Sequence, residues 1–569
     1  MKSISIGKQN FLSIREKDNF YIDKTKFIKE WWENEDVVTL ITRPRRFGKT
    51  LNMNMLECFF SCQYEGRGEL FEGLEIWKEE KYQKMQGSYP VIFLSFADVK
   101  GTTFQASREG ILSVIIELYK TYHFLLKSDI FTEEEKNYIH SFDINMTQHI
   151  EVSDTTIARS IKNLSMFLEK YYGKKTIILL DEYDTPLQEA YINGYWKELV
   201  DFIRGLFNST FKTNPYLERA VMTGITRVSK ESVFSDLNNP EVVTTTSNKY
   251  ATAFGFTEEE VFIALDEAGM AKERKGVKEW YDGFTFGTHT DIYNPWSITK
   301  FLDSRKYEPH WADTSSNGLI NKLIQKSSAD IKMNMEELLK GNTIRVKLDE
   351  QIVFEHLERK KNAIWSLLLA SGYLKVDYAR TGKPDGISYY ELALTNYEVQ
   401  LMFNDMIHDW FETQDVSCND FIKALLKGDL KAMNHYMNKV ALATFSFFDS
   451  GNTPSEQTEP ERFYHGFVLG LMVEQSKDYQ IGSNRESGFG RYDVIMEPIG
   501  EKKDSLPAIV LEFKVRDAQE EKTLEDTVKS AHDQIEKMCY DEELLKRGIK
   551  KEQIRHYGFA FQGKTVLIG

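Results

Sequence analysis

The first half of the chain alternates runs of consecutive apolar residues with stretches of helical spacing. The apolar runs lie at residues 37–42, 91–96, 176–181 and 220–225. Strands covered by helices on both faces are apolar at consecutive positions, whereas strands with one solvated face alternate. Helical stretches such as 110–120 and 157–172 separate these runs. The pattern predicts an α/β domain over residues 1–250, with a parallel sheet and helices on both of its faces.

Beyond residue 250 the hydrophobic pattern changes in two steps. Residues 251–330 combine helical spacing with many aromatic side chains, which predicts a helical subdomain. Within residues 331–448, a helical stretch leads into two strand-like runs on either side of Pro384-Asp385-Gly386, which favours a hairpin turn. A helix followed by a hairpin resembles part of a winged-helix unit, so a winged-helix-like middle region is predicted there.

Residues 449–460 are polar and rich in small residues and proline, which is typical of a linker. Behind them, helical spacing is followed by the strand-like sequences YDVIMEP and AIVLEFKV, a helical stretch at 523–538 and the sequence HYGFAFQG. We therefore predict a separate α/β domain over residues 461–569.

Composition and charge exclude several classes of protein. The 569 residues are 41% hydrophobic and 13% aromatic, which argues against wholesale disorder. The net charge of −15 excludes a globally basic nucleic-acid binder, although a local basic patch stays compatible with it. Four cysteines are too few for a disulfide framework. No apolar run of about 18 residues and no apolar leader occur, so we expect a cytoplasmic protein without a membrane partner.

The apolar run 37–42 is followed by the sequence RPRRFGKT, which has the features of a phosphate-binding loop. The pattern G-x-x-x-x-G-K-[ST] is met, except that Arg43 replaces the first glycine. Gly48 allows backbone N–H groups to approach a phosphate, and the following helix N-terminus favours anions. Lys49 would reach the β- and γ-phosphates of ATP, and the Thr50 hydroxyl would bind Mg²⁺. A basic loop that caps an ordinary helix is the alternative.

Carboxylates at the end of the third predicted strand provide a partner for that loop. Asp181 ends the run 176–181 and Glu182 follows it directly, at the strand end where a phosphate-bound Mg²⁺ would lie. Asp181 would hold the metal, and Glu182 would orient or deprotonate the attacking water. Thr223 and Arg227, at the end of the fourth predicted strand, suit detection of the γ-phosphate. A solvated acidic strand end is the alternative.

A second group of charged residues lies near the C-terminus. Asp493 begins one predicted strand, and Glu512 and Lys514 share one face of the next because residues i and i+2 project together. Two carboxylates and a lysine on adjacent strands could bind Mg²⁺ and place a cation near a scissile phosphate. A cross-strand salt bridge at the surface is the alternative.

Further residues could complete this second group. Gln534, on the next predicted helix, could orient the lysine or a phosphate, and a solvated helix position is nearly as plausible. Glu461 or Glu474 could add a carboxylate, and the pattern does not choose between them.

Other charged and aromatic residues have ambiguous roles. Arg45 and Arg46 could contact phosphate or act across the subunit interface of a homo-oligomer, and solvated charge is an equally good explanation. Trp280, Trp296 and Trp311 are expected to pack the helical subdomain rather than to stack on nucleic-acid bases.

Nine motifs occur in a characteristic order along the chain. The first four are FYIDKTKFI (20–28), RPRRFGKT (43–50), LLDEYDTP (179–186) and TGITRVSKES (223–232). The others are WYDGF (280–284), YNPWSI (293–298), YHGFVLGLM (464–472), SNRESGFGRYD (483–493) and LEFKV (511–515). Together they resemble a family of bacterial and archaeal proteins that pair an AAA-ATPase-like domain with a C-terminal PD-(D/E)XK nuclease domain.

The resemblance implies a P-loop NTPase sheet and a restriction-endonuclease-like C-terminal α/β domain. By this resemblance, a phosphate-binding loop that lacks the first glycine, where Arg43 stands here, is typical of the family. The nucleotide site implied by the resemblance is Gly48, Lys49, Thr50, Asp181 and Glu182. The implied nuclease triad is Asp493, Glu512 and Lys514, with Gln534 as its companion on a helix.

Our leading functional hypothesis is an ATP-binding and ATP-hydrolysing protein whose nucleotide state gates a Mg²⁺-dependent nuclease. The resemblance favours DNA over RNA as the substrate, although no sequence feature separates the two. An alternative is a nucleotide-dependent switch that binds nucleic acid or a partner protein without cleavage. A third hypothesis is an ATPase scaffold that the C-terminal domain merely stabilises.

Overall fold

The computed structural model of the chain describes most of its residues. They are 2–148, 152–227, 240–312, 320, 323–324, 329–348, 363–380, 389–412, 418–445, 468, 472, 475, 478–483, 486–487, 490–491, 494–517, 520–562 and 565–569. The chain forms two compact units, one of residues 1–323 and 341–400 and the other of residues 324–340 and 401–569. The four domain ranges inferred from the sequence stay predictions.

A five-stranded parallel sheet forms the centre of the first unit. Its strands, in chain order, are β1 (Val38–Thr42), β2 (Val91–Ser95), β3 (Thr176–Asp181), β4 (Leu217–Gly224) and β5 (Glu241–Val243). In space the order is β2-β3-β4-β1-β5. The four strands that the apolar runs predict are confirmed, and β5 is an addition. β4 lies between β1 and β3, so the loop after β1 and the acidic end of β3 are one strand apart.

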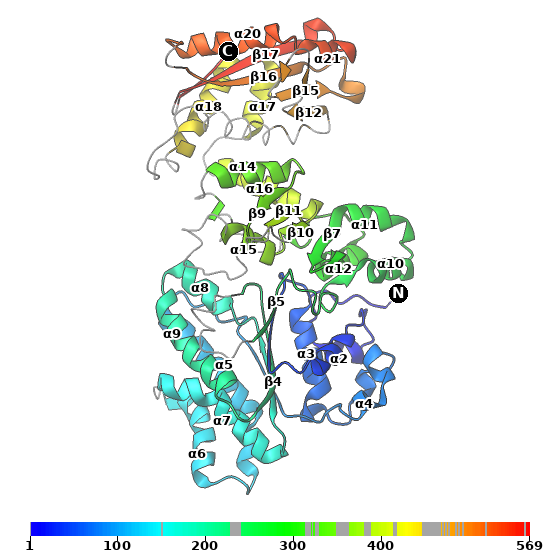
Figure 1. Cartoon of the computed structure of the whole chain (residues 1–569), viewed down its shortest axis with the longest axis vertical. Coiled ribbons are helices and arrows are strands. Elements are labelled where there is room, and N and C mark those ends of the chain that lie inside the picture. The colour runs from blue at the N-terminus through cyan, green and yellow to red at the C-terminus, as the bar shows by residue number, and fades with distance from the viewer. Residues whose placement is uncertain are drawn as a thin grey trace. The chain divides into compact units, whose positions relative to one another are not determined.

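Helices cover both faces of this sheet, as predicted (Figure 1). One face carries α1 (Phe11–Glu16), α2 (Lys26–Glu33), α3 (Lys49–Phe60) and, further out, α4 (Glu80–Gln83). The other carries α5 (Phe104–Thr121), α6 (Glu133–Gln148), α7 (Asp154–Tyr172), α8 (Thr185–Asn193) and α9 (Trp196–Phe207). Alternate residues of β3 enter the two cores: Ile177 packs with the first group of helices and Ile178 with the second. Burial on both faces explains the uninterrupted apolar runs.

The predicted helical subdomain also contains a small antiparallel sheet. The sheet consists of β6 (Phe256–Thr257), β7 (Asp282–Phe286) and β8 (His289–Tyr293), in the order β6-β8-β7. The helices are α10 (Glu258–Glu267), α11 (Arg274–Tyr281) and α12 (Pro295–Ser304). Local sequence sets the helix starts, because Thr257 and Glu260 form a capping box and Asn294 caps α12 ahead of Pro295.

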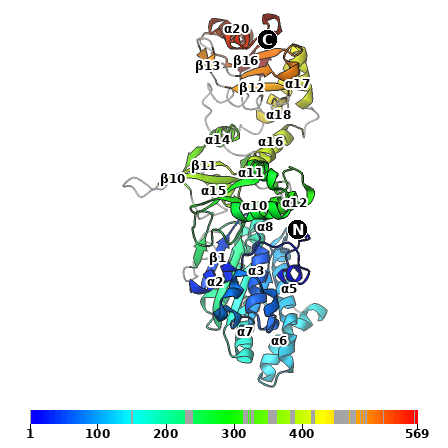
Figure 2. The same ribbon diagram turned by 90° about the vertical axis from the view of Figure 1, so that its right-hand side faces the viewer.

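The last part of the first unit contains the predicted helix and its antiparallel strand pair. Helix α15 (Ala363–Ala370) leads into β10 (Leu374–Arg380), which pairs with β11 (Tyr389–Leu394) (Figure 2). Strand β9 (Ile344–Val346) completes the sheet in the order β10-β11-β9. The predicted turn at Pro384-Asp385-Gly386 lies outside the described residues.

The second unit contains a mixed sheet between two groups of helices. Its strands are β12 (Tyr479–Ser483), β15 (Val494–Pro498), β16 (Ala508–Val515), β17 (Ile554–Gln562) and β18 (Thr565–Ile568), in that spatial order. β16 and β17 are parallel, and the other pairs are antiparallel. A separate short pair is formed by β13 (Glu486–Ser487) and β14 (Gly490–Arg491). The predicted α/β fold of the C-terminal part is confirmed, and its range of residues 461–569 stays a prediction.

The helices of the second unit pack on both faces of the mixed sheet. Helices α17 (Cys418–Lys427) and α18 (Leu430–Phe445) share a core with Leu511 and Phe513 of β16. Helices α20 (Leu524–Lys537) and α21 (Asp541–Lys546) pack on Val510 from the opposite face. The unit also includes α14 (Ala329–Leu339) and most of α16 (Tyr397–Glu412). Among the described helices of the chain, none is long and apolar enough to span a bilayer.

Candidate functional site

The predicted phosphate-binding loop connects β1 to α3. Helix α3 begins at Lys49, directly after Gly48, whose φ of 78° lies in the left-handed region that glycine adopts without steric cost. The backbone of Gly48 therefore turns sharply into the helix, whose first N–H groups have no partner within the helix itself. Strand, loop and helix follow one another as the sequence predicts.

Lys49 and Thr50 are already hydrogen-bonded within the site. The Lys49 ammonium is buried and donates to the carbonyls of Arg43 at 3.1 Å and Pro44 at 2.9 Å. Burial lowers the pKa of Lys49, and the nearby carboxylates of Glu182 and Asp181 counteract that shift. The Thr50 hydroxyl donates to Asp181 Oδ2 at 2.6 Å. The first residues of α3 and the end of β3 are thereby joined.

Asp181 is the central acceptor of this arrangement. Its side chain is buried at the end of β3, and its second oxygen accepts a hydrogen bond from the Thr223 hydroxyl of β4. Burial raises the pKa of Asp181, while the two hydroxyl donors lower it. Glu182 is half-buried, has a left-handed φ of 51° and accepts a hydrogen bond from Thr185 at 3.2 Å. We call Gly48, Lys49, Thr50, Asp181 and Glu182 the phosphate-loop site.

The Arg43 side chain is anchored in the protein interior. Its guanidinium is fully buried and donates to the carbonyls of Thr42 (2.8 Å), Thr244 (2.9 Å) and Tyr250 (3.3 Å). It also lies over the Phe286 ring, with its central carbon 4.3 Å from the ring centroid. Burial lowers the pKa of Arg43 to about 9. The backbone carbonyl of Arg43 accepts a hydrogen bond from Lys49, whereas its side chain anchors the start of the loop to the carbonyls of Thr244 and Tyr250.

Asp184 joins the site to the segment that carries Arg227, a role that sequence reasoning missed. The Asp184 carboxylate is buried and accepts from the backbone N–H groups of Ile225 (3.0 Å) and Thr226 (2.9 Å) and from the Thr226 hydroxyl (2.8 Å). The Tyr183 hydroxyl donates to the Thr226 carbonyl at 2.7 Å. We call these hydrogen bonds of Asp184 to Ile225 and Thr226 the Asp184 clamp. Arg227 follows Thr226 directly and is half-buried.

Gly224, at the end of β4, packs closely against Asp184. A side chain on Gly224 would place its Cβ 2.6 Å from an Asp184 oxygen, which is too close for any other residue. A signal for these hydrogen bonds does exist in the sequence, because the second aspartate of the DEYD sequence lies three residues beyond Asp181, directly after a buried strand.

In the second unit, the structure brings Glu512 and Gln534 together. Glu512 and Lys514 occupy alternate positions of β16 on the face that α20 covers. Glu512 is 3% exposed, Lys514 is half-buried, and the Gln534 amide on α20 donates to Glu512 Oε1. We call these three residues the C-terminal site. Asp493, Glu461 and Glu474 lie outside the described residues.

The strand arrangement of the second unit agrees with the expectation of adjacent strands. β15 begins at Val494, which pairs with Leu511 in an antiparallel register. The strand that follows Asp493 in the sequence is therefore the direct neighbour of the strand that carries Glu512.

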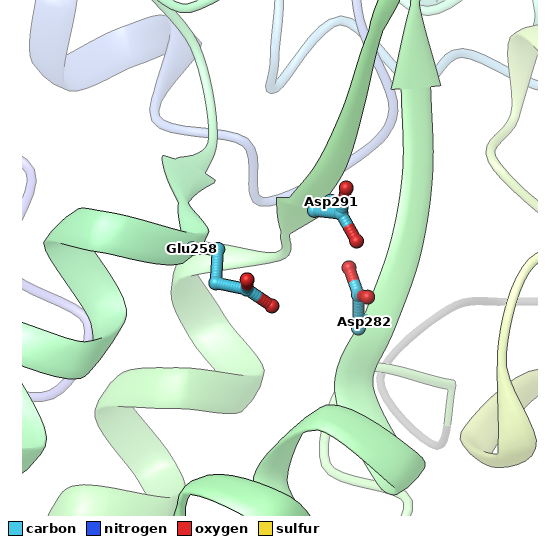
Figure 3. Close-up of side chains that lie close together, drawn as sticks. All are labelled: Glu258, Asp282 and Asp291. Carbon is cyan, nitrogen blue, oxygen red and sulfur yellow. The ribbon is translucent and has the colours of Figure 1, made fainter.

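A third group of carboxylates occurs in the subdomain with α10 and was not expected from the sequence. Oxygens of Glu258, Asp282 and Asp291 lie within 4.8 Å of one another, close enough to share a metal ion (Figure 3). However, the Lys278 ammonium lies 3.1 Å from Asp291 and 3.7 Å from Asp282, and it also pairs with Glu258. Burial and the neighbouring Asp291 raise the pKa of Asp282 to about 7. Lys278 supplies the positive charge here, so we interpret the cluster as an ion-pair network.

The fold of the first unit and the position of its loop define a class of protein. A parallel sheet whose first strand leads through a Gly-Lys-Thr loop into a helix, with an aspartate at the end of a nearby strand, is typical of P-loop nucleotide-binding domains. In agreement, residues 5–234 match a family model described as a predicted AAA-ATPase. Residues 459–569 match a model of the PD-(D/E)XK nuclease superfamily. The two matches confirm the family resemblance inferred from the motifs.

One relative has a curated sequence that spans most of the chain. It is the "Uncharacterized protein in vnfD 5′region" of Azotobacter chroococcum mcd 1, which is 25% identical over 414 residues. The similarity covers 71% of this chain and 70% of the relative.

Proposed function

We propose that the protein is a nucleotide-gated, Mg²⁺-dependent nuclease that binds and hydrolyses ATP in its first unit and cleaves nucleic acid, preferably DNA, in its second. The observation that supports this most strongly is the hydrogen bond from the Thr50 hydroxyl to Asp181, next to the buried Lys49, at one end of the parallel sheet. The two family matches support the pairing of an ATPase with a nuclease.

The residues of the phosphate-loop site fit a nucleotide and its metal. Thr50 and Asp181 offer hydroxyl and carboxylate oxygens in direct contact, and such hard oxygen ligands suit Mg²⁺. Lys49 would exchange its carbonyl partners for phosphate oxygens, which carry full negative charge and attract the ammonium more strongly. Glu182 would orient the attacking water, and Thr223 and Arg227 would detect the γ-phosphate.

The residues of the C-terminal site fit a phosphodiester and its metal. Asp493 and Glu512 would hold Mg²⁺, and Gln534 would keep the Glu512 carboxylate in one orientation. Lys514 would stabilise the negative charge that develops on the phosphate. Bound Mg²⁺ in such a site activates water and neutralises phosphate charge.

A cleavage assay on supercoiled DNA with Mg²⁺, with and without ATP, tests this proposal. We expect Glu512→Gln and Lys514→Ala to lose cleavage while ATP binding persists. Matched controls are Glu536→Gln and Lys529→Ala, which make the same changes at exposed positions of α20 and should cut normally. Wild-type cleavage by both site variants would refute the nuclease assignment. ATP binding without any cleavage by the wild type would instead support the non-cutting switch.

A further inference from the structure

The outer side of the phosphate loop is held by residues far along the chain. The Arg45 carbonyl accepts hydrogen bonds from the Trp311 indole at 3.1 Å and from the Asn294 amide at 3.3 Å. Both donors are almost fully buried. The Arg46 guanidinium lies 3.8 Å from the centre of the Trp296 ring. The subdomain that contains α12 therefore holds the loop directly.

These contacts fix the orientation of a backbone N–H group in the loop. The peptide bond between Arg45 and Arg46 is planar and trans, so its C=O and N–H groups point in opposite directions. Because Trp311 and Asn294 bind the carbonyl, the Arg46 N–H is directed away from them. Arg46 also has a φ of 61°, a left-handed conformation that costs a non-glycine residue energy and needs support from its surroundings.

The backbone of Trp311 makes a second contact that leads away from the loop. The Trp311 N–H donates to Glu398 Oε1 at 2.5 Å, and the Ser297 hydroxyl of α12 donates to Glu398 Oε2 at 3.0 Å. The Glu398 side chain is completely buried, and burial of a carboxyl group is costly unless hydrogen bonds satisfy it. The positions of Trp311 and Glu398 are therefore tightly linked.

Glu398 lies in the first turn of α16, which Asn396 caps through a hydrogen bond from the Val399 N–H at 3.1 Å. This helix begins in the first compact unit, and from Leu401 onward its residues belong to the second. A continuous series of contacts thus connects the Arg45 carbonyl, Trp311, Glu398 and the start of α16.

We propose that Trp311 and Glu398 are positioning residues that couple nucleotide binding at the phosphate loop to the first turn of α16. This inference rests on the proposed nucleotide-binding function and identifies the residues through which the gating acts. Coupling between two sites is reciprocal, so a change at α16 must alter nucleotide affinity as much as nucleotide alters α16. Coupling of this kind typically changes affinity by about 5–150-fold.

The link between Trp311 and the phosphate loop is tested by the nucleotide affinity of the full chain, measured by calorimetry with a non-hydrolysable ATP analogue. We expect Trp311→Phe, which removes the indole donor, to weaken binding about tenfold. Glu398→Gln should weaken it less, and the double variant should be no weaker than Trp311→Phe because both residues act in one series. The control is Trp365→Phe, which alters an equally buried indole on α15 and should leave affinity unchanged.

Hydrogen–deuterium exchange tests the link between the phosphate loop and the first turn of α16. Loss of packing alone would not make this exchange depend on nucleotide. In the wild type, the ATP analogue should slow amide exchange at residues 397–400. In Trp311→Phe, a saturating concentration of the analogue should leave that exchange rate unchanged.

The two levels of the proposal fail in different ways. Equal affinity of the wild type and Lys49→Ala for the analogue would refute the nucleotide site itself. Loss of binding in Lys49→Ala together with wild-type affinity and wild-type exchange in Trp311→Phe would refute only the coupling. Should Trp311→Phe fold poorly in thermal denaturation, Glu398→Gln provides the same test, and normal nucleotide-dependent exchange in that variant would overturn the coupling.

Discussion

The phosphate-loop site and the C-terminal site are built in contrasting ways. In the first, Thr50, Asp181 and Thr223 come from three separate elements, and both threonine hydroxyls donate to Asp181 at the carboxyl end of β3. In the second, Glu512 and Lys514 share one strand, and Gln534 follows 22 residues after Glu512. The first site therefore depends on tertiary assembly of distant segments, whereas the second is encoded largely within one stretch of sequence. Substitutions far from the first site should affect it more than distant substitutions affect the second.

The largest expected effect is on ATP hydrolysis, which should depend on the phosphate-loop site and not on the C-terminal site. Lys49→Ala should reduce ATP hydrolysis by about 10²–10³-fold, because the charge that stabilises the transferring phosphate is removed. Glu512→Gln should leave ATP hydrolysis unchanged, since its strand belongs to a different sheet. Steady-state phosphate release measures both rates. A comparable loss of hydrolysis in Glu512→Gln would show that the two sites are not separate.

A substitution in the C-terminal site should have a smaller and strictly local effect. Gln534→Ala removes the amide that orients Glu512 and should lower the cleavage rate about 10–100-fold, as expected for a residue that supports a metal ligand. Rates on plasmid DNA across a Mg²⁺ titration measure it. Asp533→Ala, an exposed neighbour on α20, is the control. Equal rates for the two variants would contradict a role for Gln534.

The clamp at Asp184 should reveal the tertiary dependence of the phosphate-loop site. Asp184→Asn replaces a carboxylate oxygen that accepts two backbone N–H groups, so the free energy of unfolding should fall by about 1–3 kcal/mol. ATP hydrolysis should fall as well, because the segment before Arg227 loses its anchor. Urea denaturation and phosphate release measure the two effects, with Asp201→Asn on the surface of α9 as control. Unchanged hydrolysis would separate the clamp from the site.

The smallest expected effect concerns the ion-pair network of Glu258, Asp282, Asp291 and Lys278. Folding raises the pKa of Asp282 to about 7, above the ordinary value of about 4. The folded state therefore binds this proton more tightly, and its contribution to stability is lost as pH rises from about 4 to 7. Over that pH range, Asp282→Asn should lose about 1 kcal/mol less stability than the wild type, because solvent screens the partly exposed carboxylate and reduces its contribution.

Urea denaturation of Asp282→Asn between pH 4 and 8 measures the slope of stability against pH. Asp266→Asn, which removes a more exposed carboxylate paired with Arg274, is the control. A wild-type slope in Asp282→Asn would mean that other groups determine the pH dependence.

Sequence patterns predicted the parts of the fold that depend on short-range order. The runs that became β1 and β3 are apolar throughout because both faces of the sheet are buried, and Gly48 precedes α3 because its turn requires a left-handed conformation. The element order around the phosphate loop and the β15–β16 pair followed from the same logic. The roles of the individual site residues stay predictions.

Contacts between distant segments could not be predicted from the sequence. Arg43 bonds to carbonyls about 200 positions away, and Trp311 bonds to Arg45 across 266 positions. No local pattern encodes such partners, because they depend on how the subdomain with α12 packs on the sheet. The same reason applies to the carboxylate network at Lys278.

The most direct test of the account measures the DNA cleavage rate with and without ATP in the wild type and in Lys49→Ala. The account predicts Mg²⁺-dependent cleavage whose rate changes with ATP in the wild type and is insensitive to ATP in Lys49→Ala. An identical response to ATP in both proteins would contradict control of the nuclease by the phosphate-loop site.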